Sequence, residues 1–306
     1  MSRIHWDPSP SPYRLHTTGN MRCLNRLASL LILARSITSC TPAPSPDADP
    51  VISEEMHIFL LAGQSNMAGR GEVEAQDRTP HPRIWMLDRN LEWVPAADPL
   101  HFDKPIAGVG PGLTFARALV ERDQELVIGL VPAAVGGSPI SAWEPGAWYQ
   151  ETNSRPWDDA LERVRFAMPS GELKAILWHQ GESDSNGESA PQYQERLRRL
   201  VQRFRDELDD SDLPFLVGGL GCFPERPWDR WRATVDSAHR ALPNVVPRAA
   251  FISADGLAHK GDTVHFNSEA ARELGRRYAN AYQRMSDGIA SPPAAQPACA
   301  LVETAR

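Results

Sequence analysis

Short apolar runs alternate with longer amphipathic segments between about residue 55 and residue 285. Six of the runs have the length of a strand, and most are apolar throughout, which is typical of strands buried on both faces of a parallel sheet. They are His57 to Ala62, Arg83 to Leu87, Leu126 to Ala134, Leu173 to His179, Pro214 to Gly218 and Val245 to Ser253. We therefore expect a mainly parallel sheet with helices on both faces.

Amphipathic segments between these runs predict five helices, from proline or capping residues at their starts and apolar stripes along their lengths. They span Leu113 to Glu121, Trp157 to Phe166, Pro191 to Leu208, Trp228 to Leu242 and Asn267 to Met285. Asn267 is the expected N-cap of the last helix.

Alternating β and α elements predict an α/β fold. The expected domain is three-layered, doubly wound and flavodoxin-like, with a mainly parallel sheet of about five strands. Such sheets hold their ligands at the carboxyl ends of the strands. The residues that directly follow each strand are therefore the first candidates for a functional site.

The first forty residues have the pattern of an export leader. A basic stretch from Met21 to Arg26 precedes the apolar run Leu27 to Ala34 and the sequence Ile37-Thr38-Ser39-Cys40. This order is typical of a secretory signal, and its end resembles the lipobox of bacterial lipoproteins, in which Cys40 would carry the lipid anchor. Residues 1–20 then lie upstream of the true start, and the protein is anchored to a membrane or secreted. The alternative is a leader that exports nothing, which leaves the protein in the cytoplasm.

Proline-rich sequence separates the leader from the folded domain. Residues 41–54 are expected to form a linker, residues 55–285 the folded domain, and residues 286–306 a flexible tail. The apolar run of the leader is shorter than the roughly 18–20 residues that a membrane-spanning helix needs. Any membrane tether is therefore expected through the lipid on Cys40.

The composition is that of a soluble globular protein. The chain has 306 residues, 42% of them hydrophobic and 23% charged, and a formal net charge of -7. An acidic chain without a Lys/Arg stripe is not expected to bind nucleic acid, whose phosphates need a basic surface. Four scattered cysteines form no disulfide scaffold, and without metal-ligand spacing or a His-Glu-x-x-His sequence we expect no metal and no cofactor.

The segment Gly63 to Gly71 follows the first predicted strand and contains Ser65. A serine on a strand-to-helix turn presents its hydroxyl to the crevice, where the next backbone N–H groups can stabilise an oxyanion. The alternative is a serine that only caps the next helix. The segment differs from the G-x-S-x-G nucleophile elbow, because Met67 stands in the place of the second glycine.

Asp262 and His265 lie three residues apart, just before the last predicted helix. A single turn of chain can bring the carboxylate to one imidazole nitrogen, so that the other nitrogen accepts the proton of Ser65. Asp255 and His259 form a competing pair with a different spacing.

Two loops that follow inner strands contain candidate hydrogen-bond donors. Gly136 and Gly137 come after the strand that ends at Ala134, and glycine lets backbone N–H groups approach a ligand closely. Gln180 comes directly after the strand that ends at His179 and offers a side-chain amide. The alternatives are a tight turn for the first loop and a solvated polar loop for the second.

Together these segments resemble the SGNH hydrolase superfamily, in the branch of sialate O-acetylesterases, acetylxylan esterases and related carbohydrate esterases. The resemblance runs from about His57 to Tyr282. Its motifs are Gly63-Gln64-Ser65-Asn66-Met67-Ala68-Gly69-Arg70-Gly71, Gly108-Val109-Gly110-Pro111-Gly112, the Gly136-Gly137 loop, Trp178 through Asp184, and Asp262-Thr263-Val264-His265. The wider superfamily usually has Asp in the place of Gln64 and an Asn donor in the place of Gln180, so these two residues favour the carbohydrate-esterase branch.

The resemblance implies a serine esterase in which Ser65 is the nucleophile, His265 the general base and Asp262 the residue that orients it. Its partner would be an O-acetylated carbohydrate of the acetylxylan or sialic acid type, deacetylated through an acyl-enzyme on Ser65. Two alternatives stay open. One is a broad-specificity lipase or thioesterase of the same superfamily, and the other is a catalytically silent glycan-binding module.

The same resemblance implies an oxyanion hole formed by the Ser65 backbone N–H, by Gly136 or Gly137, and by Gln180. Candidates for substrate contacts are Gln64, Asn66, Trp143 and Glu182. Trp143 follows the glycine loop, as do Trp148 and Trp157, and an aromatic face there could stack on a sugar ring. Core packing is the alternative for the tryptophans, and loop-fixing hydrogen bonds are the alternative for Glu182.

Overall fold

The computed structural model describes residues 56–289 and residue 299. The predicted leader with Cys40, the linker over residues 41–54 and most of the predicted tail lie outside the described residues. Within residues 56–289, no helix combines the length and the apolar composition that crossing a bilayer would require.

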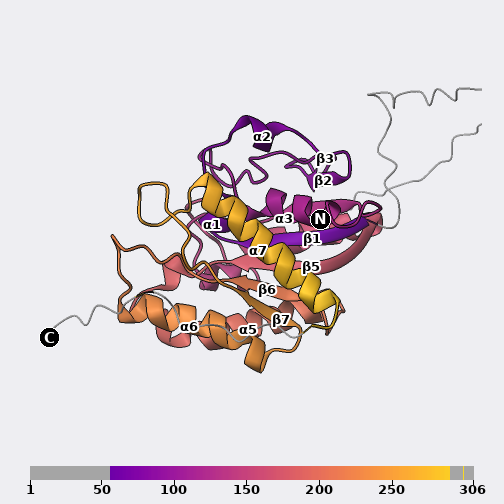
Figure 1. Ribbon diagram of the computed structural model, residues 1–306. Helices are drawn as coiled ribbons and strands as arrows, with labels where there is room; N and C mark the ends of the chain where they lie inside the picture. Colours follow the sequence, from indigo (N-terminus) through magenta and orange to yellow (C-terminus); the bar gives the residue numbers. More distant parts are fainter. Residues whose placement is uncertain (1–55, 290–298, 300–306) are drawn as a thin grey trace, which may run out of the picture. The chain divides into compact units, whose positions relative to one another are not determined.

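A seven-stranded sheet in the order β3-β2-β4-β1-β5-β6-β7 forms the middle of the domain (Figure 1). Its strands are β1 (Met56–Gly63), β2 (Ile84–Leu87), β3 (Trp93–Pro95), β4 (Ile128–Pro132), β5 (Gly171–His179), β6 (Phe215–Gly218) and β7 (Ala249–Ile252). All neighbours pair in parallel except β3, which pairs with β2 in the antiparallel sense. The predicted α/β class and mainly parallel sheet are confirmed.

Three details of the sheet differ from the prediction. It has seven strands, whereas about five were expected. The edge strand β3 was not expected, because three residues after a turn at Leu91 are too short to give a strand pattern. In addition, β4 lies between β1 and β2, whereas the flavodoxin-like order would place β2 beside β1.

All five predicted helices are present, with ends shifted by one to three residues. The helices are α1 (Ser65–Ala68), α2 (Ala75–Arg78), α3 (Pro111–Val120), α4 (Pro156–Ala167), α5 (Ala190–Glu207), α6 (Arg230–Val245) and α7 (Ser268–Ser286), with 3₁₀ turns at Ile140–Trp143, Met168–Ser170 and Glu182–Asp184. The predicted N-cap of α7 is confirmed, since the Asn267 side chain accepts a hydrogen bond of 2.8 Å from the backbone N–H of Ala270.

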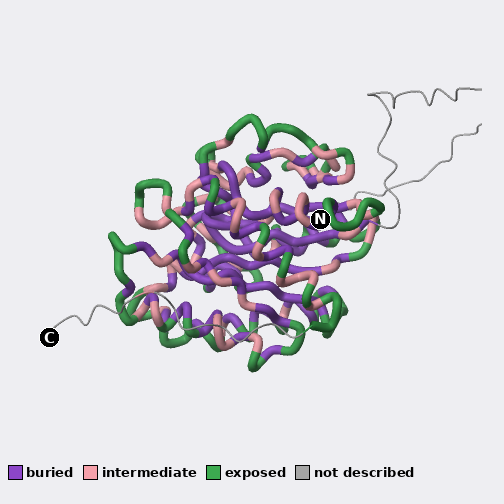
Figure 2. The backbone as a smooth tube through the Cα atoms, in the orientation of Figure 1, coloured by how far each residue is buried: buried purple, intermediate pink, exposed green. Residues whose placement is uncertain are grey.

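The sheet separates two hydrophobic cores, because successive side chains of a strand point to opposite faces. In β1, Ile58 and Leu60 belong to the core that α4, α5 and α6 cover. Phe59 and Leu61 belong to the core that α3 and α7 cover. Figure 2 shows the result as buried strands in the middle and exposed outer faces on the helices.

A disulfide joins Cys222 to Cys299 across 77 positions of sequence. Cys222 lies in the loop between β6 and α6, so residue 299 is covalently held beside that loop. This disulfide was not predicted, because the spacing of four scattered cysteines does not define a pairing.

Asp98 is a buried carboxyl group at the β2–β3 end of the sheet. It is 4% exposed, and its Oδ1 atom has no hydrogen-bond partner in the described part of the chain. Burial, reinforced by the charge of Asp77, raises its pKa to about 8. Folded protein therefore keeps a proton on Asp98 at pH values where the unfolded chain has lost it.

We predict that Asp98→Asn flattens the dependence of stability on pH. Between about pH 4 and pH 8 the folded state binds one proton more than the unfolded state, so the free energy of unfolding falls by up to about 1.4 kcal/mol per pH unit as pH rises. Urea unfolding at pH 5 and pH 8 measures this fall. Asp206→Asn, at an exposed position of α5, is the control. An equal fall in wild type and Asp98→Asn would show that Asp98 is ionised in the folded protein.

Candidate active site

The ends of β1 and β5 meet where the site begins. Gly63 pairs with His179, and the backbone N–H of Gln64 donates to the His179 carbonyl over 2.8 Å. Gly63 has a φ of 124°, and a Cβ atom there would lie 2.2 Å from that carbonyl oxygen. Only glycine fits this turn. The turn places Ser65, which is 5% exposed, at the first position of α1.

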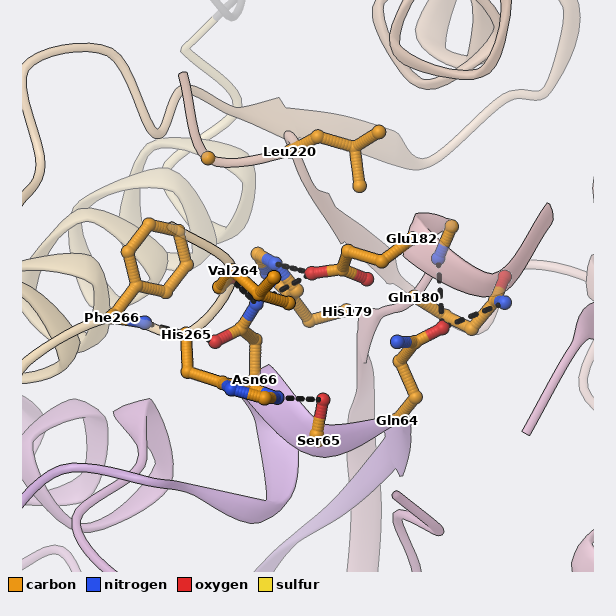
Figure 3. Close-up of polar contacts among 12 residues, drawn as sticks. Gln64, Ser65, Asn66, His179, Gln180, Glu182, Leu220, Val264, His265 and Phe266 are labelled. Atoms are coloured by element: carbon orange, nitrogen blue, oxygen red, sulfur yellow. Dashed lines mark hydrogen bonds and ion pairs between the residues drawn. The ribbon is translucent and has the colours of Figure 1, made fainter. Parts of the chain in front are cut away.

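Ser65, His265 and Asp262 form a continuous hydrogen-bonded series (Figure 3 shows Ser65 and His265). The Ser65 Oγ atom lies 3.0 Å from His265 Nε2, and His265 Nδ1 lies 2.7 Å from Asp262 Oδ2. Because a carboxylate accepts from Nδ1–H, the Nε2 atom is left to accept the proton of the serine hydroxyl. The two segments that the sequence separates by 200 positions are thus brought together at the carboxyl edge of the sheet.

Asp262 is held as a carboxylate by its surroundings. Burial raises its pKa, but hydrogen bonds from the backbone and ring of His265 and from the backbone of Val264 outweigh that effect and lower the pKa to about 2. The competing pair is not assembled in this way. His259 Nε2 lies 3.3 Å from Glu225, and Asp255 accepts a hydrogen bond from Ser253.

Asn66 links the two sides of the site. Its amide nitrogen donates to Glu182 Oε1 over 2.5 Å and to the Val264 carbonyl over 3.1 Å. Its oxygen accepts from the backbone N–H of Phe266 over 3.1 Å. Asn66 was expected to contact substrate. The structure instead shows its polar atoms engaged within the protein, where they fix the segment on either side of His265.

The structure distinguishes the two loop glycines. The N–H of Gly136 donates to Asp103 Oδ2 over 2.8 Å, and the same oxygen pairs with Arg70 at 2.7 Å. The N–H of Gly137 has no acceptor within the described residues, and Gly137 lines the cavity beside Ser65. Of the two groups, the N–H of Gly137 is the one left available to a ligand.

Gln180 directly follows β5 as predicted, but its side chain does not face the cavity. It is 0% exposed and outside the cavity lining. Its amide nitrogen donates to Gln64 Oε1 over 3.0 Å, to Asp184 Oδ2 over 2.6 Å and to the Ser138 carbonyl over 3.2 Å. The predicted oxyanion donor is therefore already engaged, because the packed core surrounds it with protein acceptors.

Gln64 has the opposite arrangement. Its oxygen accepts from Gln180, while its amide nitrogen has no acceptor among the described residues. Gln64 lines the cavity, and Figure 3 shows this nitrogen on the side of Ser65. Gln64, which was predicted to contact substrate, thus presents an amide donor on the side of Ser65.

Trp143 requires a correction. It is 0% exposed, packs edge-to-face on Trp178 and donates its indole N–H to Ser138 Oγ over 3.1 Å. Trp143 is therefore part of the core and does not contact substrate. Trp157 is likewise buried, and the exposed ring of Trp148 carries the Arg155 guanidinium on its face.

A cavity of about 390 Å³ opens at Ser65 and His265. Most of the residues that line it are polar or charged. The lining residues are Gln64, Ser65, Arg70, Lys104, Ile106, Gly136, Gly137, Glu182, Ser183, Ser185, Arg226, Pro227, Asp229, Arg232, Val264 and His265. Within the described part of the chain, no three His, Cys, Asp or Glu side chains gather as metal ligands.

A serine, a histidine and an aspartate in series at the carboxyl edge of a parallel sheet are typical of serine hydrolases that cleave esters. Comparison with known proteins agrees with this class. The family described as carbohydrate esterase, sialic acid-specific acetylesterase, matches residues 55–284. The chain belongs to this family of carbohydrate esterases and is thus a hydrolase that acts on esters.

Individual relatives support the same assignment. A probable carbohydrate esterase of Arabidopsis thaliana is 33% identical over 250 residues, which cover 74% of this chain and 89% of the relative. A crystal structure of an Arabidopsis thaliana protein has a TM-score of 0.66 at 32% identity, over 75% of this chain and 98% of that chain. A carbohydrate acetylesterase from Xanthomonas citri shares the fold, with a TM-score of 0.60 at 20% identity over 76% of this chain and 57% of its own.

Proposed function

We propose that the protein is a serine esterase that removes acetyl groups from O-acetylated carbohydrates. The observation that carries the proposal is the series from Ser65 through His265 to Asp262, with distances of 3.0 Å and 2.7 Å. The family membership of the chain supports an acetylated carbohydrate as the substrate class.

In the proposed mechanism, His265 Nε2 takes the hydroxyl proton of Ser65 as Oγ attacks the acetyl carbonyl carbon. The tetrahedral intermediate collapses, His265 returns the proton to the departing sugar oxygen, and an acetyl-enzyme remains on Ser65. Water, deprotonated by His265, then attacks the acetyl-enzyme and releases acetate. Asp262 keeps the imidazole oriented and stabilises its protonated form.

Three donors are available to the oxyanion in this mechanism. They are the backbone N–H of Ser65, the N–H of Gly137 and the Nε2 group of Gln64, none of which has an acceptor in the described chain. Gln180 then acts as a positioning residue, because its hydrogen bond holds the Gln64 oxygen and turns the Gln64 nitrogen toward the reaction.

The walls of the cavity favour a short acyl group. Ile106, Pro227 and Val264 are its only larger apolar lining residues among those described, whereas a long acyl chain needs a continuous apolar channel. This lining favours an acetylesterase over the lipase alternative. The assembled series of Ser65, His265 and Asp262 favours an enzyme over a silent glycan-binding module.

We predict that Ser65→Ala lowers kcat on acetyl esters by about 10⁴-fold or more, because the nucleophile is lost. The measurement is acetate release from a panel of short-chain and long-chain esters, acetylated xylan and acetylated sialic acid. Ser237→Ala, at an exposed position of α6, is the control. Preference for long acyl chains in the wild type, or full activity in Ser65→Ala, would contradict the proposal.

We predict that Gln64→Met lowers kcat by ~10²–10³-fold with little change in KM, since it removes one oxyanion donor at nearly constant side-chain length. Steady-state kinetics on an acetyl ester measure the effect. Gln202→Met, on the exposed face of α5, repeats the exchange away from the site. Wild-type turnover in Gln64→Met would exclude this donor.

We also propose that the protein is exported and anchored through a lipid on Cys40. The leader pattern supports this location, as does the Cys222–Cys299 disulfide, because disulfides persist mainly in oxidising compartments. Cys40→Ser is expected to move the protein from the membrane fraction to the soluble fraction and to abolish palmitate labelling, without loss of esterase activity. Cys23→Ser is the matched control. Equal fractionation of the two variants would exclude the anchor.

A further inference from the structure

Behind Gln64 and Gln180, two buried polar side chains extend the hydrogen bonds of the site into the helix layer. They are Tyr193 on α5 and His239 on α6, each 0% exposed. Neither lines the cavity beside Ser65, and neither takes part in the proposed mechanism. Polar groups are costly to bury unless they are hydrogen-bonded, so the contacts of these two side chains indicate what they do.

The contacts form one series of side chains. His239 Nε2 lies 3.0 Å from the Tyr193 hydroxyl oxygen, which lies 2.7 Å from Gln180 Oε1. The amide nitrogen of Gln180 in turn donates to Gln64 Oε1 over 3.0 Å (Figure 3). The series therefore joins α6 and α5 to the ends of β5 and β1, where the site begins.

The Tyr193 hydroxyl donates toward Gln180. Burial raises the pKa of Tyr193 well above its usual value, so the hydroxyl keeps its proton. Gln180 Oε1 can only accept, and its short distance of 2.7 Å assigns this single proton to it. The oxygen of Tyr193 is then left to accept a hydrogen bond from His239 Nε2.

The surroundings of His239 favour a proton on Nε2. Burial lowers the pKa of His239 to about 3, so the ring is neutral and carries one proton. The Nδ1 atom is buried and has no hydrogen-bond partner in the described chain. A proton on Nδ1 would leave a buried N–H unpaired and would place two acceptors against the single proton of Tyr193. The Nε2–H form avoids both costs.

The amide of Gln180 is fixed at both ends. Tyr193 donates to its oxygen, and Asp184 Oδ2 accepts from its nitrogen over 2.6 Å. The same nitrogen reaches the Gln64 oxygen, to which the backbone nitrogens of Gly181 and Ser183 approach only within 3.4 Å. Gln180 is therefore the closest donor that determines which end of the Gln64 amide faces Ser65.

Every hydrogen bond of the series points in one direction, from His239 toward Gln64. Hydrogen bonds in such a chain polarise one another, and a low local dielectric strengthens them. An amide that accepts at its oxygen becomes a better donor at its nitrogen. The series thus both orients the free N–H of Gln64 and strengthens it as a donor.

We propose that Tyr193 and His239 are positioning residues for ester cleavage, because they hold Gln180 in the orientation that turns the Gln64 amide nitrogen toward the oxyanion. This inference rests on the proposed acetylesterase function. Neither side chain touches a reacting atom. Because the oxyanion forms only in the transition state, their loss is expected in kcat and not in KM.

The first test is Tyr193→Phe, which removes the hydroxyl and keeps the ring. We expect kcat on an acetyl ester to fall by about 10-fold with KM unchanged, which is less than the loss of an oxyanion donor itself. Tyr278→Phe is the matched control, since its buried hydroxyl donates to the Trp178 carbonyl over 2.7 Å outside the series. Equal loss of kcat in the two variants would overturn the proposal.

Variants of His239 test the start of the series. His239→Leu removes the N–H donor, and we expect kcat to fall by about 3-fold through weaker polarisation and looser positioning of Tyr193. His239→Gln retains an amide N–H at a similar distance from the backbone, and we expect it to restore most of the loss. If His239→Gln is as slow as His239→Leu, the N–H of His239 is not what acts.

A double-mutant cycle separates positioning of Gln64 from a general effect on the fold. In Gln64→Met the donor at the end of the series is already absent, so adding Tyr193→Phe should lower kcat by less than about 2-fold. A full further loss of about 10-fold on top of Gln64→Met would show that Tyr193 acts on something other than Gln64.

Nitrogen-15 NMR of the His239 ring reports the direction of the series without catalysis. We expect the neutral Nε2–H form between about pH 5 and pH 8 in the full chain. The Nδ1–H form or a protonated ring would overturn the proposal even if every acetyl ester is cleaved. An Nε2–H ring in a protein that cleaves no ester would instead overturn the esterase function, and with it the role of the series in catalysis.

Discussion

The register of β1 against β5 determines where the functional groups lie. Gly63 and His179 are directly paired and are the last residues of their strands. The chain leaves the sheet at the same level on both strands, so Gln64 and Gln180, which are 116 positions apart, come within hydrogen-bond distance. A slip of one residue would reverse the side-chain directions of one strand. The requirement for glycine at residue 63 follows from the same close approach of the two backbones.

Much of the fold was predictable, because it depends on patterns that are local in sequence. Unbroken apolar runs and amphipathic stripes gave the strands and the long helices, and Asn267 marked the start of α7. The elements that were missed lack such a pattern. β3 has three residues, and the position of β4 between β1 and β2 depends on packing across the whole sheet. The pairing of Cys222 with Cys299 likewise has no local signal.

The residues of the candidate site could be predicted where residue type and local spacing are enough to indicate a role. Asp262 and His265 are three residues apart, so a single turn of chain brings their side chains together. Ser65 follows β1 closely, which places it at the carboxyl edge of the sheet. The direction of Gln180 could not be inferred, because its acceptors come from three other segments of the fold.

The basic side chains beside the Gly136–Gly137 loop are neutralised within the protein. On the side of the Gly136–Gly137 loop, Arg70 and Lys104 are neutralised by carboxylates of the protein, so N–H dipoles are the groups left for an oxyanion. Preorganised dipoles stabilise charge as it forms without attracting a full anion beforehand. An unpaired arginine at that wall would bind substrate carboxylates or the acetate product in the place of the ester. In the proposed mechanism, the ion pairs of Arg70 and Lys104 therefore leave this wall to the charge that the reaction creates.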